Sequence, residues 1–387
     1  MTTKNINQYE VNSPKTVAFI VLLGAFGAAI LLEAPVLVGA IVTQLGFSEA
    51  QAGYVMSADL GGMGIGSLLA LWWVGKINWR KVARVAMIAV AIGNLSTILA
   101  DSFELLLLLR LVTGTFAGTC MVICIVTIHL MKDPDRGFGF LIMGNLLYQT
   151  IAIVLLSRIL PVLGLGFAYG TIALAMLIFS FFVHYLPEYG KHDVNKTENT
   201  PTEYRRLFWA MLGLISMLSY YIGVTGVWAY IERLGDGAGL SGEMVGNALA
   251  TSSVLGLLGA GLATILTAKY GRLLPVLTGH LLTIVGISIL TTSFTYSTYI
   301  IAACIFNFAW NFVLPYMLAC IASVDTTGRL VASTNGFVGI GLALGPAMVA
   351  SVYSPDNIDL AMWLCCGFVG LSLVLIFRLS LSRSVSA

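Results

Sequence analysis

The sequence predicts an all-α membrane protein, with twelve transmembrane helices in two pseudo-symmetric six-helix bundles. Its composition is the first reason: 58% of the residues are hydrophobic, only 10% are charged, and the mean hydropathy is +0.93. Such a chain cannot cover its own surface with polar groups. Apolar stretches of 18 or more residues recur almost end to end, each long enough to cross a bilayer as a helix. Backbone groups in lipid must pair within their own segment, which favours helices over strands.

A single long polar connection, near residues 187–206, divides these stretches into two groups of six. Its Lys, Glu, Asn and Thr content is typical of a flexible linker. The predicted spans are 16–43, 50–75, 82–100, 104–130, 138–160, 165–186, 207–234, 243–268, 273–293, 297–322, 330–353 and 358–380. The predicted domains are a tail at 1–15, an N-terminal bundle at 16–186, the linker at 187–206, a C-terminal bundle at 207–380 and a tail at 381–387.

The basic residues predict the orientation, because Lys and Arg accumulate on the cytoplasmic side of a membrane. If the N-terminus lies inside, all of them except Arg110, Arg158 and Arg233 fall in or beside inner segments. The linker and both tails are then cytoplasmic. We expect a multi-pass protein of the cytoplasmic (inner) membrane, and the polar first fifteen residues predict no cleavable signal peptide.

The cysteines and the lack of known binding motifs indicate which cofactors and partners to expect. All six cysteines lie inside apolar stretches, where they are expected to pack as small residues rather than form disulfides or metal sites. No phosphate loop, nucleotide fingerprint or metal-ligand pair is evident in the sequence. We therefore expect no cofactor, no metal and no nucleic-acid partner, and a monomer whose partners are the lipid bilayer, a small organic solute and protons.

An internal repeat links the two halves at an offset of 193 residues, from position 46 to 239 and from 53 to 246. Gly46 and Ser48 precede the second predicted span, and Gly239 and Ser241 precede the eighth. Each serine is placed to cap a helix, and Ser48 with Gln51 forms the pattern of a capping box. Shared landmarks at one offset predict that both halves have the same architecture.

Paired six-helix halves joined by a cytoplasmic linker resemble the major facilitator superfamily of secondary transporters. The family has a basic loop after its second helix, and the segment with Lys76 and Arg80 is similar to it. The second copy of this loop, in the other half of the chain, contains Lys269 and Arg272. The acidic residue that normally precedes these basic residues is replaced by Gly75 in the first copy and by Ala268 in the second. The resemblance implies alternating access, with these four basic residues at a cytoplasmic gate, whereas anchoring by the positive-inside rule is the open alternative.

The family's fourth helix is similar to the segment that starts at Arg110 and continues with Gly114 and Gly118. Glycines four residues apart place a small face on the helix and allow close packing. Arg110 is the functional candidate of this segment, because a guanidinium in hydrocarbon is costly unless it faces water or a carboxylate.

Two carboxylates, Glu33 and Asp59, lie inside predicted spans. Counted from the outer helix ends at about 1.5 Å per residue, they and Arg110 lie roughly 9–15 Å deep, so the three are expected to share one layer. Burial favours the neutral form of a carboxyl group and a nearby arginine the charged form, a competition that suits proton exchange. A static ion pair is the open alternative. Pro35 is expected to loosen the first helix beside Glu33.

The resemblance also implies a solute cavity lined by helices 1, 4, 7 and 10. Polar and aromatic residues of helices 5, 7 and 10 are its candidates, with interhelical packing as the alternative for the amides and a membrane-interface position for Trp228. Pro315 is expected to break helix 10 nearby. The candidates are Tyr148, Gln149, Tyr221, Trp228, Asn307, Trp310 and Asn311.

These features together predict a secondary transporter of a small organic solute, coupled to protons through Glu33, Asp59 and Arg110. An uncoupled facilitator of the same fold is the first alternative. The second is an intramembrane serine protease, since Gly239 to Gly242 matches a short rhomboid motif around Ser241 and His280 lies in a later helix. We expect no enzyme, because a serine at a helix start is usually a cap.

Overall fold

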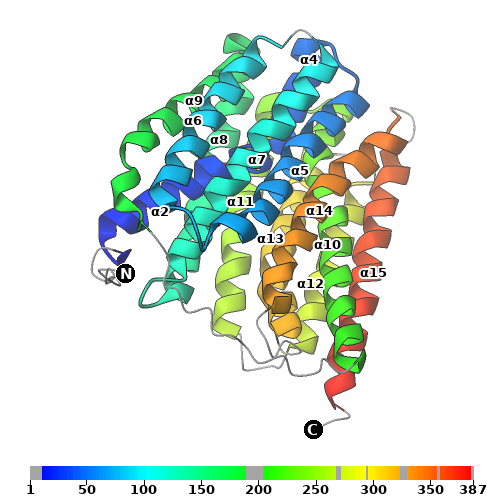
Figure 1. Ribbon diagram of the computed structural model, residues 1–387. Helices are drawn as coiled ribbons and strands as arrows, with labels where there is room; N and C mark the ends of the chain where they lie inside the picture. Colours follow the sequence, from blue (N-terminus) through cyan, green and yellow to red (C-terminus); the bar gives the residue numbers. More distant parts are fainter. Residues whose placement is uncertain are drawn as a thin grey trace. The chain divides into compact units, whose positions relative to one another are not determined.

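A computed structural model describes residues 11–100, 102–188, 204–266, 272–292, 295–322, 329–354 and 358–384. Every regular element in these ranges is a helix (Figure 1). The first half contains α2 (Pro14–Gly27), α3 (Ala29–Leu32), α4 (Ala34–Leu45), α5 (Glu49–Trp73), α6 (Trp79–Ile98), α7 (Phe103–Ile128), α8 (Pro134–Leu163), α9 (Leu165–Phe181) and the 3-10 turn η1 (Val183–Tyr185). The second contains α10 (Tyr204–Gly237), α11 (Gly242–Leu266), α12 (Leu273–Ile289), α13 (Tyr296–Ala322), α14 (Arg329–Val352) and α15 (Ile358–Ser384).

The predicted fold class is confirmed. By length and composition, 7 of the described helices are apolar enough to cross a membrane, and the shorter apolar helices have 10–17 residues. With α2, α3 and α4 taken as one interrupted segment, the helix order fits two sets of six. Several helix ends differ from the predicted spans by a few residues. Two of them cross a predicted domain boundary: α10 begins at Tyr204, inside the predicted linker, and α15 extends to Ser384, inside the predicted tail. Residues 189–203 of the linker lie outside the described ranges.

The chain divides into two compact units that do not coincide with the two halves of the sequence. Unit 1 contains the described residues of Met1–Glu33, Ala58–Gln149 and Ile159–Asn195. Unit 2 contains those of Ala34–Ser57, Thr150–Arg158 and Lys196–Ala387. The segment from α2 to α4 and the helices α5 and α8 therefore each pass from one unit into the other. The domain boundaries proposed from the sequence stay a prediction.

Neighbouring helices within each unit lie side by side. In unit 1, α6 packs along α9 and α7, and in unit 2, α10 packs along α14 and α15 while α11 packs against α13 (Figure 1).

The predicted internal repeat is confirmed at the level of single residues. Gly46 and Gly239 both adopt positive φ, at 69° and 78°, a backbone conformation that L side chains rarely enter. The capping box at the start of α5 is present: Ser48 N donates to Gln51 Oε1 at 3.0 Å, and Gln51 N donates to Ser48 Oγ at 3.2 Å. At the start of α11, Met244 N donates to Ser241 Oγ at 3.3 Å.

The repeat extends to helix crossings. A Cβ built on Gly66 of α5 would collide with the carbonyl of Thr115 in α7, and one built on Gly259 of α11 would collide with the carbonyl of Phe308 in α13. These two contacts are related by the same offset of 193 residues at both partners, from 66 to 259 and from 115 to 308. Each unit thus contains the same glycine-mediated crossing, in which two helix backbones approach closely.

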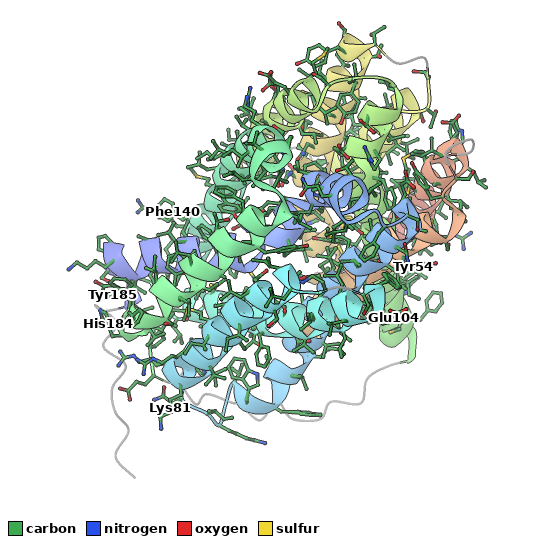
Figure 2. The ribbon with its side chains drawn as sticks, turned by 90° about the horizontal axis from the view of Figure 1, so that it is seen from above. Tyr54, Lys81, Glu104, Phe140, His184 and Tyr185 are labelled. Carbon is green, nitrogen blue, oxygen red and sulfur yellow. The ribbon has the colours of Figure 1, made fainter. Side chains whose placement is uncertain are left out.

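The segment after α9 folds back onto the start of α6. Arg80 Nε donates to the carbonyl of Leu186 at 2.6 Å, and Arg80 NH1 lies 3.1 Å from Glu188 Oε1. The rings of His184 and Tyr185, whose centroids are 4.2 Å apart, lie side by side in Figure 2. Arg80 is therefore bound to the beginning of the connection that leaves unit 1.

Candidate functional site

Asp59 and Arg110 form a buried ion pair in unit 1. Asp59 Oδ2 lies 3.1 Å from Arg110 NH1, and both residues are 1% exposed. The two groups are close enough to pair but are not aligned as a hydrogen bond, since both atoms lack a hydrogen-bond partner. The predicted meeting of these two side chains is confirmed in position; their part in proton exchange stays a prediction.

Glycines in α5 and α7 bring this pair together. A Cβ on Gly114 would lie 3.0 Å from Asp59 Cα and closer still to its carbonyl, and a Cβ on Gly118 would lie 2.7 Å from Met63 Cα. From the other helix, a Cβ on Gly62 would lie 2.8 Å from Thr115 N. The predicted close packing of the Gly114 and Gly118 face is therefore observed, and it places Asp59 beside Arg110, one turn before Gly114.

Two further residues hold the guanidinium. Arg110 NH2 donates to Asn94 Oδ1 at 3.2 Å, and Arg110 Cζ lies 4.8 Å from the centre of the Tyr169 ring. Asn94 is itself oriented by its Nδ2, which donates to the carbonyl of Val90 at 2.8 Å. Sequence reasoning missed both residues; an amide and a tyrosine within apolar helices were the available signals.

Glu33 has a different environment. It ends α3 at the interruption of the first transmembrane segment and is 3% exposed. The hydroxyl of Tyr148 in α8 donates to its Oε1, whereas its Oε2 has no hydrogen-bond partner, and Glu33 takes part in none of the ion pairs found among the described residues. Pro35 lies at the start of α4, where its missing N–H costs little, so the expected loosening next to Glu33 is present as a helix break.

Tyr169 connects these groups. Its hydroxyl-bearing ring contacts Arg110 and lies within electrostatic range of both Asp59 and Glu33. Of the three charged residues that were expected to share a layer, Arg110 therefore contacts Tyr169 directly, and Asp59 and Glu33 lie farther from it in unit 1. Two carboxyl groups and one guanidinium can together hold one proton in addition to the ion pair, which is the minimum chemistry for proton exchange.

The cavity candidates in unit 2 form an aromatic cluster around Trp310. The ring of Trp310 lies 6.4 Å from Tyr221 and 6.3 Å from Trp228, both in T-shaped arrangements. Trp228 is 2% exposed, which disagrees with an interface position. Trp310 and Tyr221 are half-buried.

The two amides of α13 bond within unit 2. Asn307 Nδ2 donates to Ser252 Oγ at 3.2 Å, and Asn311 Nδ2 donates to Asn307 Oδ1 at 3.1 Å. Asn307 is thus engaged in interhelical packing, and Asn311 remains half-buried beside it. The helix is not broken at Pro315, because α13 continues from Tyr296 to Ala322. In unit 1, Gln149 is buried next to Tyr148.

The basic residues expected at the cytoplasmic gate have separate surroundings. Lys76 is exposed, Arg80 is bound to Leu186 and Glu188, and Arg272 NH1 donates to the carbonyl of Ala319 at 2.9 Å. Lys269 lies outside the described residues. Their role in a gate stays a prediction.

The residues of the protease alternative do not form a catalytic pair with each other. Ser241 caps α11, whereas His280 bonds to the carbonyl of Val276 at 2.8 Å and to Ser372 Oγ at 3.1 Å. Both side chains therefore have local structural partners.

The repeated helical units and the buried acid–arginine pair define a multi-pass membrane transport protein. The sequence model of the Major Facilitator Superfamily matches residues 17–346, and the chain belongs to this family. It is accordingly a secondary transporter.

Solved structures share its fold at low identity. The nucleoside transporter NupG aligns with 15% identity and a TM-score of 0.72, covering 94% of this chain and 98% of its own. A D-xylose–proton symporter aligns with 15% identity and a TM-score of 0.75, covering 94% and 96%. The POT family transporter PepTSo aligns with 12% identity and a TM-score of 0.70, covering 96% and 98%. A comparison with curated protein sequences found no match.

Proposed function

We propose that this transporter moves a small organic solute by alternating access and couples that movement to protons through Glu33. The observation that carries the proposal is the buried Glu33 carboxyl group, which lacks a cationic partner among the described residues. Charge on a carboxylate is costly in such surroundings unless a proton or another cation neutralises it. Binding and release of a proton at Glu33 therefore changes the energy of the buried site during a cycle.

Asp59 and Arg110 have the supporting role in this proposal. Their charges neutralise each other, and Asn94 and Tyr169 hold the guanidinium in place. Arg110 is thereby kept from pairing with Glu33. The fold neighbour named as a D-xylose–proton symporter adds support for proton coupling within this fold, but its solute is its own.

The proposed setting follows the sequence. The protein acts as a monomer in the cytoplasmic membrane with both termini inside, as the distribution of Lys and Arg indicates. Aromatic and amide side chains around Trp310 supply solute contacts in unit 2. The inner gate is formed by the basic residues of the two repeated loops, Lys76, Arg80, Lys269 and Arg272.

Proteoliposomes containing an entrapped pH dye test this proposal. Solutes are screened for those whose entry changes the internal pH, and Glu33→Gln is then compared with the wild type. We expect the variant to lose accumulation driven by a pH gradient and to keep solute exchange between the two sides at saturating solute concentration. Glu104→Gln, at an exposed carboxylate in the first turn of α7, is the matched control.

The uncoupled facilitator predicts a different result. In that case net solute movement leaves the internal pH unchanged, and Glu33→Gln transports as well as the wild type. This outcome would exclude proton coupling and leave the secondary transporter assignment intact.

A further inference from the structure

Two buried hydrogen-bond acceptors in unit 1 have no donor. One is Glu33 Oε2, and the other is Asn145 Oδ1 in α8. Asn145 precedes Tyr148 by three residues, so both lie on one face of the helix, and the Tyr148 hydroxyl is already used on Glu33 Oε1. Buried acceptors are nearly always paired, and an unpaired one costs about 1–3 kcal/mol. Both oxygen atoms therefore need a hydrogen-bond donor, and a ligand can supply it.

The aromatic neighbours of Glu33 add a second feature. The ring of Phe26 lies 4.8 Å from that of Tyr148 and 5.5 Å from that of Phe179. Asn145, Tyr148 and Phe26 are half-buried, whereas Glu33 is buried. A buried acidic group is thus bonded to one member of a cluster of aromatic rings. Such rings attract cations through their faces and also contact apolar groups.

Charge considerations decide which ligand suits these atoms. An anion would be repelled by Glu33, and Arg110, the buried cation nearby, is engaged by Asp59 and Asn94. A neutral solute would leave the charge of an ionised Glu33 uncompensated. An ammonium group neutralises the carboxylate and offers up to three N–H donors, enough for Glu33 Oε2 and Asn145 Oδ1 together.

We infer that Glu33 and Asn145 bind the ammonium group of an organic amine whose apolar body packs on Phe26, Tyr148 and Phe179. The inference rests on the proposed function, and it names the class of solute for the same carboxyl group. A proton and an ammonium ion then compete for Glu33. Binding of the amine to protonated Glu33 releases one proton to the solution, so charge and protons balance.

The test uses purified full-length protein and matched probes. Phenethylamine, cyclohexylamine and hexylamine are each compared with the corresponding alcohol and with a carboxylate of the same body. Binding is measured as a rise in Tm, since a ligand that binds only the folded state stabilises it. Proton release is followed with a pH indicator in weakly buffered solution. We expect at least one ammonium probe to stabilise the protein and release protons, and its alcohol and carboxylate to do neither.

Variants at Glu33 and Asn145 test whether these residues bind the ammonium group. Glu33→Gln should weaken ammonium binding about tenfold or more and abolish proton release, since a charge-assisted hydrogen bond is lost. Asn145→Leu, which keeps the side-chain size but removes the acceptor, should weaken binding about threefold to tenfold. Glu104→Gln should bind like the wild type. Size-exclusion profiles establish that each variant is folded.

Two results would overturn the inference: no ammonium probe binds better than its alcohol, or ammonium binding survives Glu33→Gln unchanged. These outcomes are separable from failure of the proposed function. If solute movement still depends on Glu33 and on the pH gradient, proton coupling stands and only the amine site is wrong. If ammonium binding needs Glu33 but no solute movement responds to a pH gradient, the coupling alone is wrong.

Discussion

Asp59 Oδ2 lies 3.1 Å from Arg110 NH1 at a site where both side chains are 1% exposed. The contact joins α5 to α7 at the position where Gly114 allows the two backbones to touch. A pair of charges in such a place is stable only while both members remain. Removing one leaves the other buried and uncompensated.

Asp59→Asn should therefore destabilise the protein by about 3–5 kcal/mol, whereas the double variant Asp59→Leu with Arg110→Met should recover much of that loss. Thermal and denaturant unfolding in the same detergent measure both effects. Wild-type stability in the single variant would show that water, rather than Asp59, neutralises the guanidinium.

The repeated glycine crossing predicts the effect of one added methyl group. Gly259→Ala places a Cβ against the carbonyl of Phe308, and Gly66→Ala does the same against Thr115. We expect each to cost about 1–3 kcal/mol through overpacking. Gly261→Ala is the matched control in the same helix α11, because a Cβ there meets open space. Equal stability of the two α11 variants would contradict the close crossing.

Contacts within unit 2 predict that a disulfide cross-link between two segments stops transport. Gly53 of α5 lies against Tyr230 and Ala350, and a Cβ on Gly53 would be 2.9 Å from Ala350 Cβ. The Tyr230 hydroxyl also donates to the carbonyl of Glu49 at 2.7 Å. If alternating access separates these segments, a disulfide between Gly53→Cys and Ala350→Cys should stop solute movement, because a disulfide needs Cβ atoms only about 3.5–4.5 Å apart.

The effect of this disulfide is measured as solute transport in proteoliposomes before and after reduction. We expect oxidation to abolish transport of an identified solute and a reducing agent to restore it, with each single-cysteine variant insensitive to oxidation. Full activity of a completely cross-linked sample would mean that these segments stay together throughout the cycle.

His280 predicts a purely structural effect. Its Nδ1 faces the carbonyl of Val276 and must donate, so its Nε2 accepts from Ser372 in the neutral ring. Ser372 in turn bonds to Ser216, which links α10, α12 and α15. His280→Ala should cost about 1–3 kcal/mol, since it leaves buried groups unpaired. His129→Ala, at an exposed histidine, should stay within about 0.5 kcal/mol of the wild type.

Local structural features could be predicted from the sequence because they depend on residues near one another in the chain. The capping box of Ser48 and Gln51 and the helix starts after Gly46 and Gly239 follow from backbone geometry within a few residues. Pro315 was misjudged for the opposite reason. Its effect depends on how neighbouring helices satisfy the backbone, and α13 continues through it.

The amino-acid sequence alone determined the membrane character, the internal repeat and the presence of costly charges at Glu33, Asp59 and Arg110, since hydropathy and helix periodicity act along the chain. Only the tertiary structure decided that Arg110 pairs with Asp59 while Glu33 bonds to Tyr148, and that Asn94 and Tyr169 complete the site. The physical reason is that partners across helices depend on the rotation and crossing of each pair. Glycine contacts and side-chain packing set these jointly, and no single segment encodes them.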